Sequence, residues 1–371
     1  MRILLAGGGS AGHVNPLLAT AEELRRRRPG TAVEVLGTET GLEKDLVPAA
    51  GYPLTFIPRA RLPRRPSPEL LGLPARLRDA VRTTAAVIDR FAPDVVVGFG
   101  GYVSTPAYRA AFTRGIPVVV HEQNARPGLA NRYGARRADV VAVTFASTPL
   151  AAARGRTVVT GLPLRGAVAE LARERAEGRG GTHRAEGARA LGLDPALPTL
   201  LITGGSLGAA SVNAAAAGAL PRLAATAQVL HLTGRGKSGP VRDARAAAGD
   251  PAGYHIREYL GEMQHAYACA DLVVTRSGAG MVCELAALGL PALYVPLPVG
   301  NGEQRLNAAD VVAAGGGVII DDAVLTPGLL ATRVVALFST PGDLLRMGER
   351  AAGAGTRDGA ARLADEIEAL A

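Results

Sequence analysis

Two glycine-rich segments carry the residues with the clearest chemical potential. The first runs from Gly7 to Gly12 and is followed at once by His13, and the second runs from Gly204 to Gly208 and contains Ser206. Glycines in such a turn permit positive φ and let the backbone approach a ligand, while the N-terminus of a following helix offers free N–H groups to an anion. Both segments therefore predict contact with a phosphorylated substrate.

His13 stands at the mouth of the first glycine segment. An imidazole has an ordinary pKa of about 6.5, so it can accept a proton from a sugar hydroxyl near neutral pH. The positive end of a helix would lower that pKa and favour the neutral, basic form. The alternative role is structural, with the ring hydrogen-bonded to the loop, and the residues by themselves leave the two roles open.

Polar residues in the second half of the chain suit the parts of a nucleotide sugar. Ser206 can donate its hydroxyl to a phosphate, and Arg165 can neutralise a diphosphate. Glu284 can accept hydrogen bonds from both ribose hydroxyls, and Gln304 and Asn307 share a helical face that suits sugar hydroxyls or amides. Taken singly, Arg165 is more simply a surface arginine and Glu284 a carboxylate that compensates a helix dipole.

Two predicted strands of the first half end in polar or glycine-rich segments. One strand ends in His121-Glu-Gln-Asn124, and the strand before it ends in Gly100-Gly-Tyr-Val-Ser104. Enzymes with parallel α/β sheets place their chemistry at such strand ends. Glu122 is therefore a second candidate base, or a residue that orients the site.

Several motifs are missing from the sequence. It contains no Asp-x-Asp, no HExxH and no GxxxxGK[ST] loop. These absences argue against a tightly held metal and against a P-loop NTPase. No cofactor is expected. Cys269 and Cys283 have no CxxC spacing, which predicts reduced thiols without a catalytic or metal role.

Short β-branched segments alternate with longer helical patterns over the 371 residues. This alternation predicts an α/β fold with two Rossmann-like domains, whose parallel sheets face one another across a deep cleft. Helical patterns cover residues 17–28, 68–90 and 102–114, and the tail at 342–370 is broken at 353–355. The charged stretch 170–189 predicts a solvated helix or a mobile segment. Strands are predicted at residues 2–6, 32–36, 54–57, 94–98, 117–121, 140–143, 157–160, 199–203, 228–233, 254–257, 272–275, 292–295 and 318–320.

Positive charge is concentrated in the first half of the chain. Residues 1–163 hold 22 Lys+Arg against 12 Asp+Glu, a net +10, and the remaining residues balance 19 against 21, a net −2, within the total of +8. Such a surface suits nucleic acid, an anionic membrane or a phosphorylated substrate. Aromatic residues make up 4% of the chain and Trp is absent, which argues against stacking on single-stranded nucleic acid.

Membrane contact, if present, is expected to be peripheral. No apolar run approaches the ~20 residues needed to span a bilayer, and the first residues predict a strand rather than a signal peptide. Arginines border an apolar stretch that suits docking on anionic lipid, although the same leucines could be helix core. These residues are Arg59, Arg61, Arg64, Arg65, Leu70, Leu71, Leu73, Arg76, Leu77, Arg78 and Arg82.

Seven motifs in order resemble the MurG family of glycosyltransferases. They are Gly7-Gly-Gly-Ser-Ala-Gly-His-Val-Asn-Pro16, Gly100-Gly-Tyr-Val-Ser104, His121-Glu-Gln-Asn124, Gly161-Leu-Pro-Leu-Arg165, Gly204-Gly-Ser-Leu-Gly208, Arg276-Ser-Gly278 with Glu284, and Glu303-Gln304 with Asn307. The resemblance covers essentially the whole chain. The family loop commonly has Thr where this chain has Ser10, and the hydroxyl is kept.

The resemblance implies a GT-B fold and an inverting transfer of N-acetylglucosamine (GlcNAc) from UDP-GlcNAc to the 4-hydroxyl of a lipid-linked muramoyl-pentapeptide, at the cytoplasmic face of the membrane. It implies an acceptor domain at 1–162 plus a C-terminal helix at about 341–371, and a donor domain at 163–340. Other cell-wall or division proteins are implied partners, and nucleic acid is not.

The resemblance also assigns roles to residues of this chain. His13 or Glu122 would be the catalytic base. The acceptor would contact Gly9, Ser10, His13, Gly101 and Tyr102. UDP-GlcNAc would contact Ser10, Ala11, Gly12, Asn124, Arg165, Ser206, Leu260, Ala279, Gly280, Met281, Val282, Cys283, Glu284, Gln304 and Asn307.

Other functions remain open from the sequence. A UDP-GlcNAc 2-epimerase, or a transferase with a soluble acceptor, would share the second-domain site. A sugar-nucleotide sensor would bind UDP-GlcNAc without turnover. A nucleic-acid binder explains the charge but not two phosphate loops, and a nicotinamide-dependent oxidoreductase explains one loop only.

Overall fold

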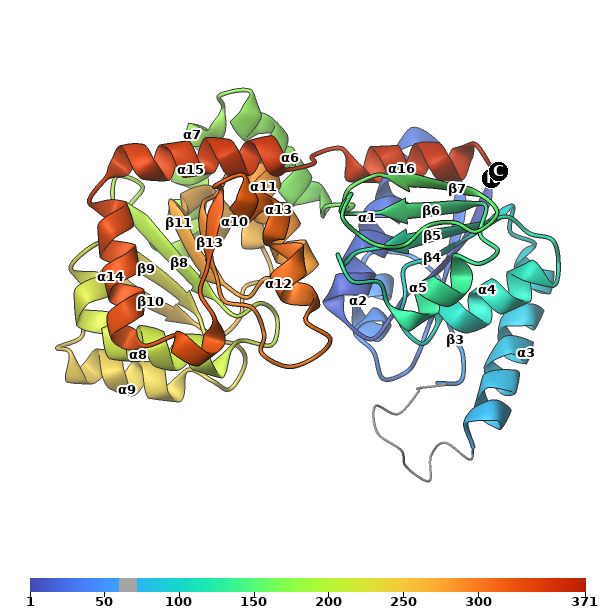
Figure 1. Cartoon of the computed structure of the whole chain (residues 1–371), viewed down its shortest axis with the longest axis horizontal. Coiled ribbons are helices and arrows are strands. Elements are labelled where there is room, and N and C mark those ends of the chain that lie inside the picture. The colour runs from blue at the N-terminus through green and yellow to red at the C-terminus, as the bar shows by residue number, and fades with distance from the viewer. Residues whose placement is uncertain (60–71) are drawn as a thin grey trace. The chain divides into compact units, whose positions relative to one another are not determined.

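A computed structural model describes residues 1–59 and 72–371 of the chain. The chain forms two units. Unit 1 comprises Met1–Gly166 together with Asp358–Ala371, and unit 2 comprises Ala167–Arg357 (Figure 1). Each unit is described by itself below.

Unit 1 is built on a seven-stranded sheet in the order β3-β2-β1-β4-β5-β6-β7, and every neighbouring pair is parallel. Its central strands consist almost wholly of buried aliphatic residues, as expected for a parallel sheet covered on both faces. The strands are β1 (Arg2–Ala6), β2 (Ala32–Gly37), β3 (Leu54–Phe56), β4 (Val95–Gly98), β5 (Val118–Glu122), β6 (Val140–Val143) and β7 (Arg156–Val159).

Helices cover both faces of this sheet because successive side chains of a strand point to opposite sides. On β1, Ile3 and Leu5 pack with α1 and α16, while Leu4 and Ala6 pack with α3 and α4. The helices of unit 1 are α1 (Ala11–Arg27), α2 (Glu43–Ala49), α3 (Leu73–Phe91), α4 (Ser104–Phe112), α5 (Leu129–Gly134) and α16 (Gly359–Glu368).

Unit 2 repeats the plan with a six-stranded parallel sheet in the order β10-β9-β8-β11-β12-β13. Its strands are β8 (Thr199–Thr203), β9 (Gln228–Leu232), β10 (Tyr254–Arg257), β11 (Leu272–Thr275), β12 (Ala292–Tyr294) and β13 (Gly317–Ile319). Its helices are α6 (Gly166–Ala176), α7 (Gly180–Leu191), α8 (Ala210–Ala224), α9 (Gly239–Ala247), α10 (Met263–Cys269), α11 (Ala279–Leu288), α12 (Glu303–Asn307), α13 (Ala309–Ala313), α14 (Pro327–Phe338) and α15 (Pro341–Ala354).

The predicted α/β class and all the predicted strands are confirmed, with bounds that differ by a residue at some ends. Three helical segments differ from the prediction. Helix α1 begins at Ala11, six residues earlier than expected, and the stretch 170–189 forms parts of two helices, of which α7 packs on α10. The tail divides: α15 belongs to unit 2 and packs on α11, while α16 belongs to unit 1 and packs on α1. The expected first-domain segment at 341–371 is thus shared between the units.

Candidate active site

Each sheet has one point at which its strand order reverses. In unit 1 this point lies between β1 and β4, and in unit 2 between β8 and β11. Ligands of doubly wound sheets bind beyond the carboxyl ends of the strands at such a point. The segments that follow these four strands are Gly7–Ser10, Phe99–Val103, Gly204–Ala209 and Arg276–Gly278. Of the predicted site residues they contain Gly9, Ser10, Gly101, Tyr102 and Ser206, and Ala11–His13 and Ala279–Glu284 follow directly on the helices that they open.

The first glycine segment forms the entry to α1. Gly9 has a φ of 89°, a conformation that a side chain would strain, and Ser10 is the N-cap of the helix. Ala11, Gly12 and His13 form the first helical turn. The ring Nδ1 of His13 lies 3.0 Å from the carbonyl oxygen of Gly8 and 3.3 Å from the hydroxyl of Ser10.

The hydrogen bond to Gly8 fixes the protonation pattern of the neutral His13 ring. A carbonyl oxygen only accepts, so Nδ1 carries the proton and Nε2 carries the free electron pair. Burial lowers the pKa of this half-buried side chain below 6.5, and the Gly8 carbonyl and the charges of Glu122 and Glu43 oppose the lowering. The direction predicted from the sequence is thus found, and burial is its largest cause. His13 has the properties of a neutral base at Nε2.

The segment after β4 lies beside His13. Gly100 and Gly101 have φ values of 91° and 80°. A Cβ atom at Gly100 would lie 3.2 Å from the His13 Nε2, and one at Gly101 would lie 2.7 Å from the Gly8 carbonyl oxygen. Both glycines are therefore required by the close approach of this segment to the first loop. Tyr102 follows, with the guanidinium of Arg59 at 5.4 Å from the centre of its ring.

Glu122 ends β5 as a buried carboxylate whose two oxygens both accept hydrogen bonds. Oε1 accepts from the backbone N–H of Asn124 at 3.0 Å and from its side-chain amide at 3.4 Å. Oε2 accepts from the N–H of Gly128 and the amide of Asn131, each at 2.9 Å. The carboxylate therefore has the contacts of a residue that orients the 124–131 segment.

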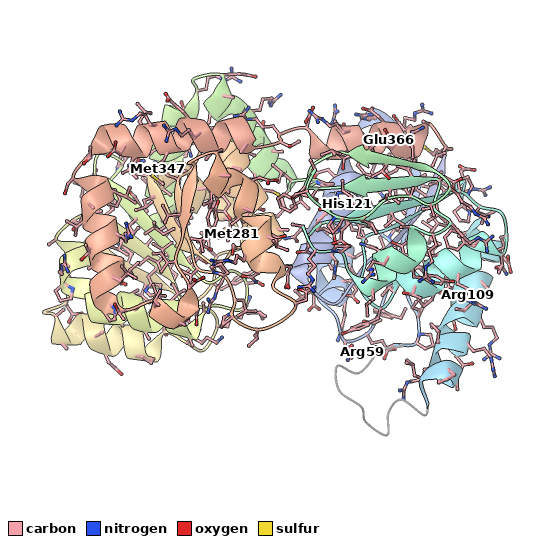
Figure 2. All side chains as sticks on the ribbon, viewed as in Figure 1. Arg59, Arg109, His121, Met281, Met347 and Glu366 are labelled. Carbon is pink, nitrogen blue, oxygen red and sulfur yellow. The ribbon has the colours of Figure 1, made fainter. Side chains whose placement is uncertain are left out.

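Asn131 was not singled out from the sequence, yet it joins three elements of unit 1. Its amide nitrogen donates to the His121 carbonyl at 3.0 Å as well as to Glu122, and its oxygen accepts from the Tyr108 hydroxyl at 2.8 Å. His121 itself is fully buried between the Gly161 carbonyl and Gln123, and burial lowers its pKa to about 4. Figure 2 labels His121 within the sheet of unit 1. Its ring is therefore a neutral structural group.

The second glycine segment has no buried residue, whereas Gly7 and Gly8 of the first are buried. Gly205 and Gly208 have φ values of 77° and 67°, and the side chains of Ser206 and Leu207 are exposed. The loop is closed by a bond from the Gly208 N–H to the Gly205 carbonyl at 3.0 Å. Lys237, another residue that the sequence analysis did not single out, donates from Nζ to the Leu207 carbonyl at 2.7 Å. This loop thus carries an exposed hydroxyl and is bonded through Leu207 to a lysine from the segment after β9.

Behind this loop lies a buried chain of neutral polar groups. Asn213 donates to the Thr233 carbonyl at 2.9 Å, and its oxygen lies 3.1 Å from Nε2 of His231, whose Nδ1 lies 2.9 Å from the Tyr254 hydroxyl. Burial lowers the pKa of His231 to about 4. The Thr233 carbonyl is the atom that a Cβ at Gly208 would meet at 2.2 Å. The chain therefore fixes the surface on which the loop rests.

Helix α11 presents the residues predicted to surround the uridine. Along its first two turns Ala279, Val282 and Glu284 are buried, and Gly280, Met281 and Cys283 are half-buried. The Tyr267 hydroxyl, from α10, donates to Glu284 Oε2 at 2.7 Å. Figure 2 labels Met281 on this helix. Glu284 is therefore held in place by a neighbouring helix.

The remaining predicted donor residues lie in several places. Gln304, half-buried on α12, accepts from the Leu297 N–H at 3.0 Å, whereas Asn307 is fully buried and donates to the Ser277 carbonyl at 3.3 Å. Leu260 is half-buried in the segment after β10. Arg165 is half-buried in the last residues of unit 1, and Asn124 follows β5 in the same unit. The structure thus places some predicted residues at the switch points of the two sheets and others after β5, after β10, on α12 and at the end of unit 1, with Asn307 as a buried support.

Arg276 has a supporting position in unit 2. Its guanidinium donates to the carbonyls of Val295 and Pro296, to the carboxylate of Asp322 and to the hydroxyl of Ser211. These bonds tie the end of β11 to the end of β12. Among residues 1–59 and 72–371, no group of three or more His, Cys, Asp or Glu side chains is arranged to hold a metal ion.

Comparison with known proteins identifies both halves of the chain. Residues 3–143 match the glycosyltransferase family 28 N-terminal domain, and residues 199–363 match the glycosyltransferase family 28 C-terminal domain. A relative from Nocardioides sp., named UDP-N-acetylglucosamine–N-acetylmuramyl-(pentapeptide) pyrophosphoryl-undecaprenol N-acetylglucosamine transferase, is 52% identical over 98% of this chain and 96% of its own length. A relative of the same name from Streptomyces coelicolor is 48% identical over 96% of this chain and 95% of its own length.

Solved structures support the same family assignment. The crystal structure of Acinetobacter baumannii MurG is similar with a TM-score of 0.76 and 28% identity, over 99% of both chains. The UDP-GlcNAc 2-epimerase of Neisseria meningitidis has a TM-score of 0.69 at 14% identity, which shows a shared fold alone. The GT-B fold expected from the sequence is confirmed. The chain therefore belongs to glycosyltransferase family 28, in the MurG family that its motifs resemble.

Proposed function

We propose that this chain transfers GlcNAc from UDP-GlcNAc to the 4-hydroxyl of an undecaprenyl-diphospho-muramoyl-pentapeptide, with inversion at the anomeric carbon. The observation that carries the proposal is the 52% identity to the Nocardioides transferase, over 98% of this chain and 96% of that relative. Identity of this extent leaves no segment of either protein unmatched that could hold a different active site.

The geometry of unit 1 supports His13 as the catalytic base. Its Nδ1 is committed to the Gly8 carbonyl, so Nε2 can accept a proton, and the ring is half-buried beside Gly100. Glu122 has four donors on its two oxygens and is better suited to orient Asn124 and Asn131 than to take a proton. Gly101 and Tyr102, from the neighbouring segment, are proposed to contact the acceptor.

The geometry of unit 2 supports a donor site after β8 and β11. The exposed Ser206 hydroxyl, with Lys237 bonded to the neighbouring Leu207 carbonyl, suits a diphosphate, and Glu284 on α11 suits the ribose hydroxyls. Gln304 is proposed to hold GlcNAc hydroxyls. The other proposed donor contacts are Ser10, Ala11, Gly12, Asn124, Arg165, Leu260, Ala279, Gly280, Met281, Val282 and Cys283.

The reaction is a single displacement. The acceptor oxygen attacks C1 of GlcNAc, the bond from C1 to the UDP oxygen breaks, and the hydroxyl proton passes to His13 Nε2. Negative charge develops on the departing diphosphate, where backbone N–H groups and cations are of most use. Each such donor contributes about 2.7–4 kcal/mol to lowering the barrier.

Docking on an anionic membrane is proposed for α3 of unit 1. Among the described residues, no helix is long and apolar enough to cross a bilayer. On α3, Arg78 and Arg82 are exposed, and Leu73 and Leu77 are half-buried, so part of the apolar face is left uncovered. Arg61, Arg64, Arg65, Leu70 and Leu71 lie outside the described residues.

A flotation experiment tests this docking. Arg78→Glu/Arg82→Glu should reduce co-flotation with vesicles containing anionic lipid, because two attractive charges become repulsive. The matched control is Arg222→Glu/Arg333→Glu, which reverses two exposed arginines of unit 2. Equal flotation of both variants would reject α3 as the docking element.

The transfer itself is tested with UDP-[14C]GlcNAc and a short-chain analogue of the lipid-linked muramoyl-pentapeptide, with and without EDTA. We expect label to move to the lipid in both conditions, and Glu284→Ala to weaken donor binding. If UDP-GlcNAc bound without movement of label, the acceptor assignment would be abandoned in favour of epimerisation or sensing.

A further inference from the structure

A buried carboxylate lies directly beneath the first glycine loop. Glu43 is the first residue of α2, and its side chain has 0% of its surface exposed. Its Oε2 accepts from the Gly9 N–H at 2.8 Å. Its Oε1 accepts from the N–H and the hydroxyl of Thr38, at 2.9 and 2.8 Å. One side chain thus ties the loop after β1 to the turn after β2.

Three glycines provide the space that this carboxylate occupies. A Cβ atom would approach the Glu43 side chain to 2.5 Å at Gly8, 2.6 Å at Gly37 and 2.0 Å at Gly41. Separations below 3.0 Å are not found for real Cβ atoms, so side chains at these positions would displace Glu43. Gly8 belongs to the first glycine loop itself, and its carbonyl accepts the hydrogen bond of His13. Glu43 and His13 are therefore attached to adjacent residues of one loop.

This arrangement changes what the glycine loop can bind. The Gly9 N–H, which would be expected to face a phosphate, is already donated to Glu43. A negative charge directly below the loop also opposes the approach of another anion. We propose that Glu43 is a positioning residue, which holds this loop so that it orients His13 and which takes the Gly9 N–H that would otherwise face the acceptor diphosphate. The inference rests on the proposed role of His13 as base.

The charged groups that face His13, among the described residues, are Glu43 on α2 and Glu122 at the end of β5. Both carboxylates raise the pKa of His13, against the larger lowering effect of burial. A nearby negative charge also stabilises the imidazolium that forms when the base takes the acceptor proton. Glu43 therefore affects both the position and the basicity of the ring.

Glu43→Gln tests the inference because it keeps the shape of the side chain and removes its charge. The chain has six histidines, which can be labelled with 13C and titrated by NMR. In Glu43→Gln the titration midpoint of His13 should be lower than in the wild type. The midpoint falls because a nearby carboxylate that stabilises the protonated ring has been removed. The acidic limb of kcat/KM should move to lower pH in parallel, and kcat should fall while KM for both substrates stays near that of the wild type.

Glu34→Gln is the matched control. Glu34 is also a buried carboxylate of unit 1, bonded to Thr55 and Arg90, but it does not act on His13. Glu34→Gln should leave the His13 midpoint unchanged. A second variant, Glu43→Asp, keeps the charge on a side chain that is one methylene shorter. It should lower kcat but change the His13 midpoint less than Glu43→Gln does.

Two outcomes would overturn the inference. If Glu43→Gln lowered thermal stability but left the His13 midpoint and the acidic limb unchanged, Glu43 would be a structural clamp only. If it lowered KM for the acceptor, the freed Gly9 N–H would be binding the diphosphate after all. Because the titration needs no turnover, it still tests Glu43 and His13 if the proposed transfer reaction proves wrong.

Discussion

The two glycine loops have similar sequences and opposite electrical surroundings. The loop after β1 lies on the Glu43 carboxylate and close to that of Glu122, and it holds a histidine. The loop after β8 lies on the neutral chain of Asn213, His231 and Tyr254 and accepts a hydrogen bond from Lys237 of the segment after β9, where Gly236 and Ser238 donate to the carboxylate of Glu258. The first arrangement favours a positive charge and therefore a proton, and the second favours an anion. A glycine pattern gives the shape of a binding loop, and the neighbouring charges decide its ligand.

The largest expected effect tests the first loop. His13→Ala should lower kcat about 10²–10⁴-fold, the usual contribution of a positioned base, with little change in the Kd of UDP-GlcNAc. The measurement is label transfer at saturating donor, together with calorimetric titration of UDP-GlcNAc. An unchanged kcat would show that His13 is not the base. The first loop would then have no catalytic role to set against the anion binding of the second.

A smaller effect is expected from the backbone of the second loop. Gly208→Ala should weaken UDP binding about 10–100-fold, because a side chain at φ 67° is strained and would meet the Thr233 carbonyl at 2.2 Å. Calorimetric titration with UDP measures this change.

Gly236→Ala is the control for that variant. Gly236 has a φ of 69°, but a Cβ atom there has nothing within 4 Å. The control therefore carries the same backbone strain without the collision. Equal loss of UDP binding in the two variants would show that the shape of the Gly208 turn is not what the donor needs.

The smallest effect concerns how Glu284 is held. Tyr267→Phe removes the hydrogen bond at 2.7 Å to Glu284 Oε2, and such a bond is worth about 1 kcal/mol. KM for UDP-GlcNAc should rise about fivefold, with kcat unchanged. The same variant should show a smaller loss with a 2′-deoxyuridine donor, since less ribose contact remains to be lost. If KM rose equally for UDP-GlcNAc and for the 2′-deoxyuridine donor, the effect of Tyr267→Phe would not depend on ribose contact.

The sequence predicted the strands and the segments after them well, because period and composition are local properties. Runs such as 95–97 and 118–120 are wholly aliphatic, which indicates a strand buried on both faces. The predicted start of the helix at 11–27 was too late because its first turn lies in a glycine-rich segment and Pro16 follows in the second turn.

Long-range contacts of single polar residues could not be predicted. Glu43 lies between Leu42 and Lys44 in what resembles an exposed helix start, and nothing in that spacing indicates that Gly8 and Gly37 surround it. The spacing of Gln304 and Asn307 predicts that both lie on one helical face. In the structure Asn307 is fully buried, whereas Gln304 is half-buried. Burial of a polar side chain depends on the tertiary fold, which local patterns do not contain.

The return of α16 to unit 1 bears on how the chain folds during synthesis. Leu363, Ala364 and Ile367 are fully buried in the core that α1 and β1 share, and Arg27 bonds to Asp365 and the Ala361 carbonyl. Unit 2 is continuous from 167 to 357, so a ribosome releases all of it before the last helix of unit 1 emerges. Unit 1 therefore cannot complete its core during synthesis until α16 has been made, and the apolar surface that α16 covers stays exposed until then.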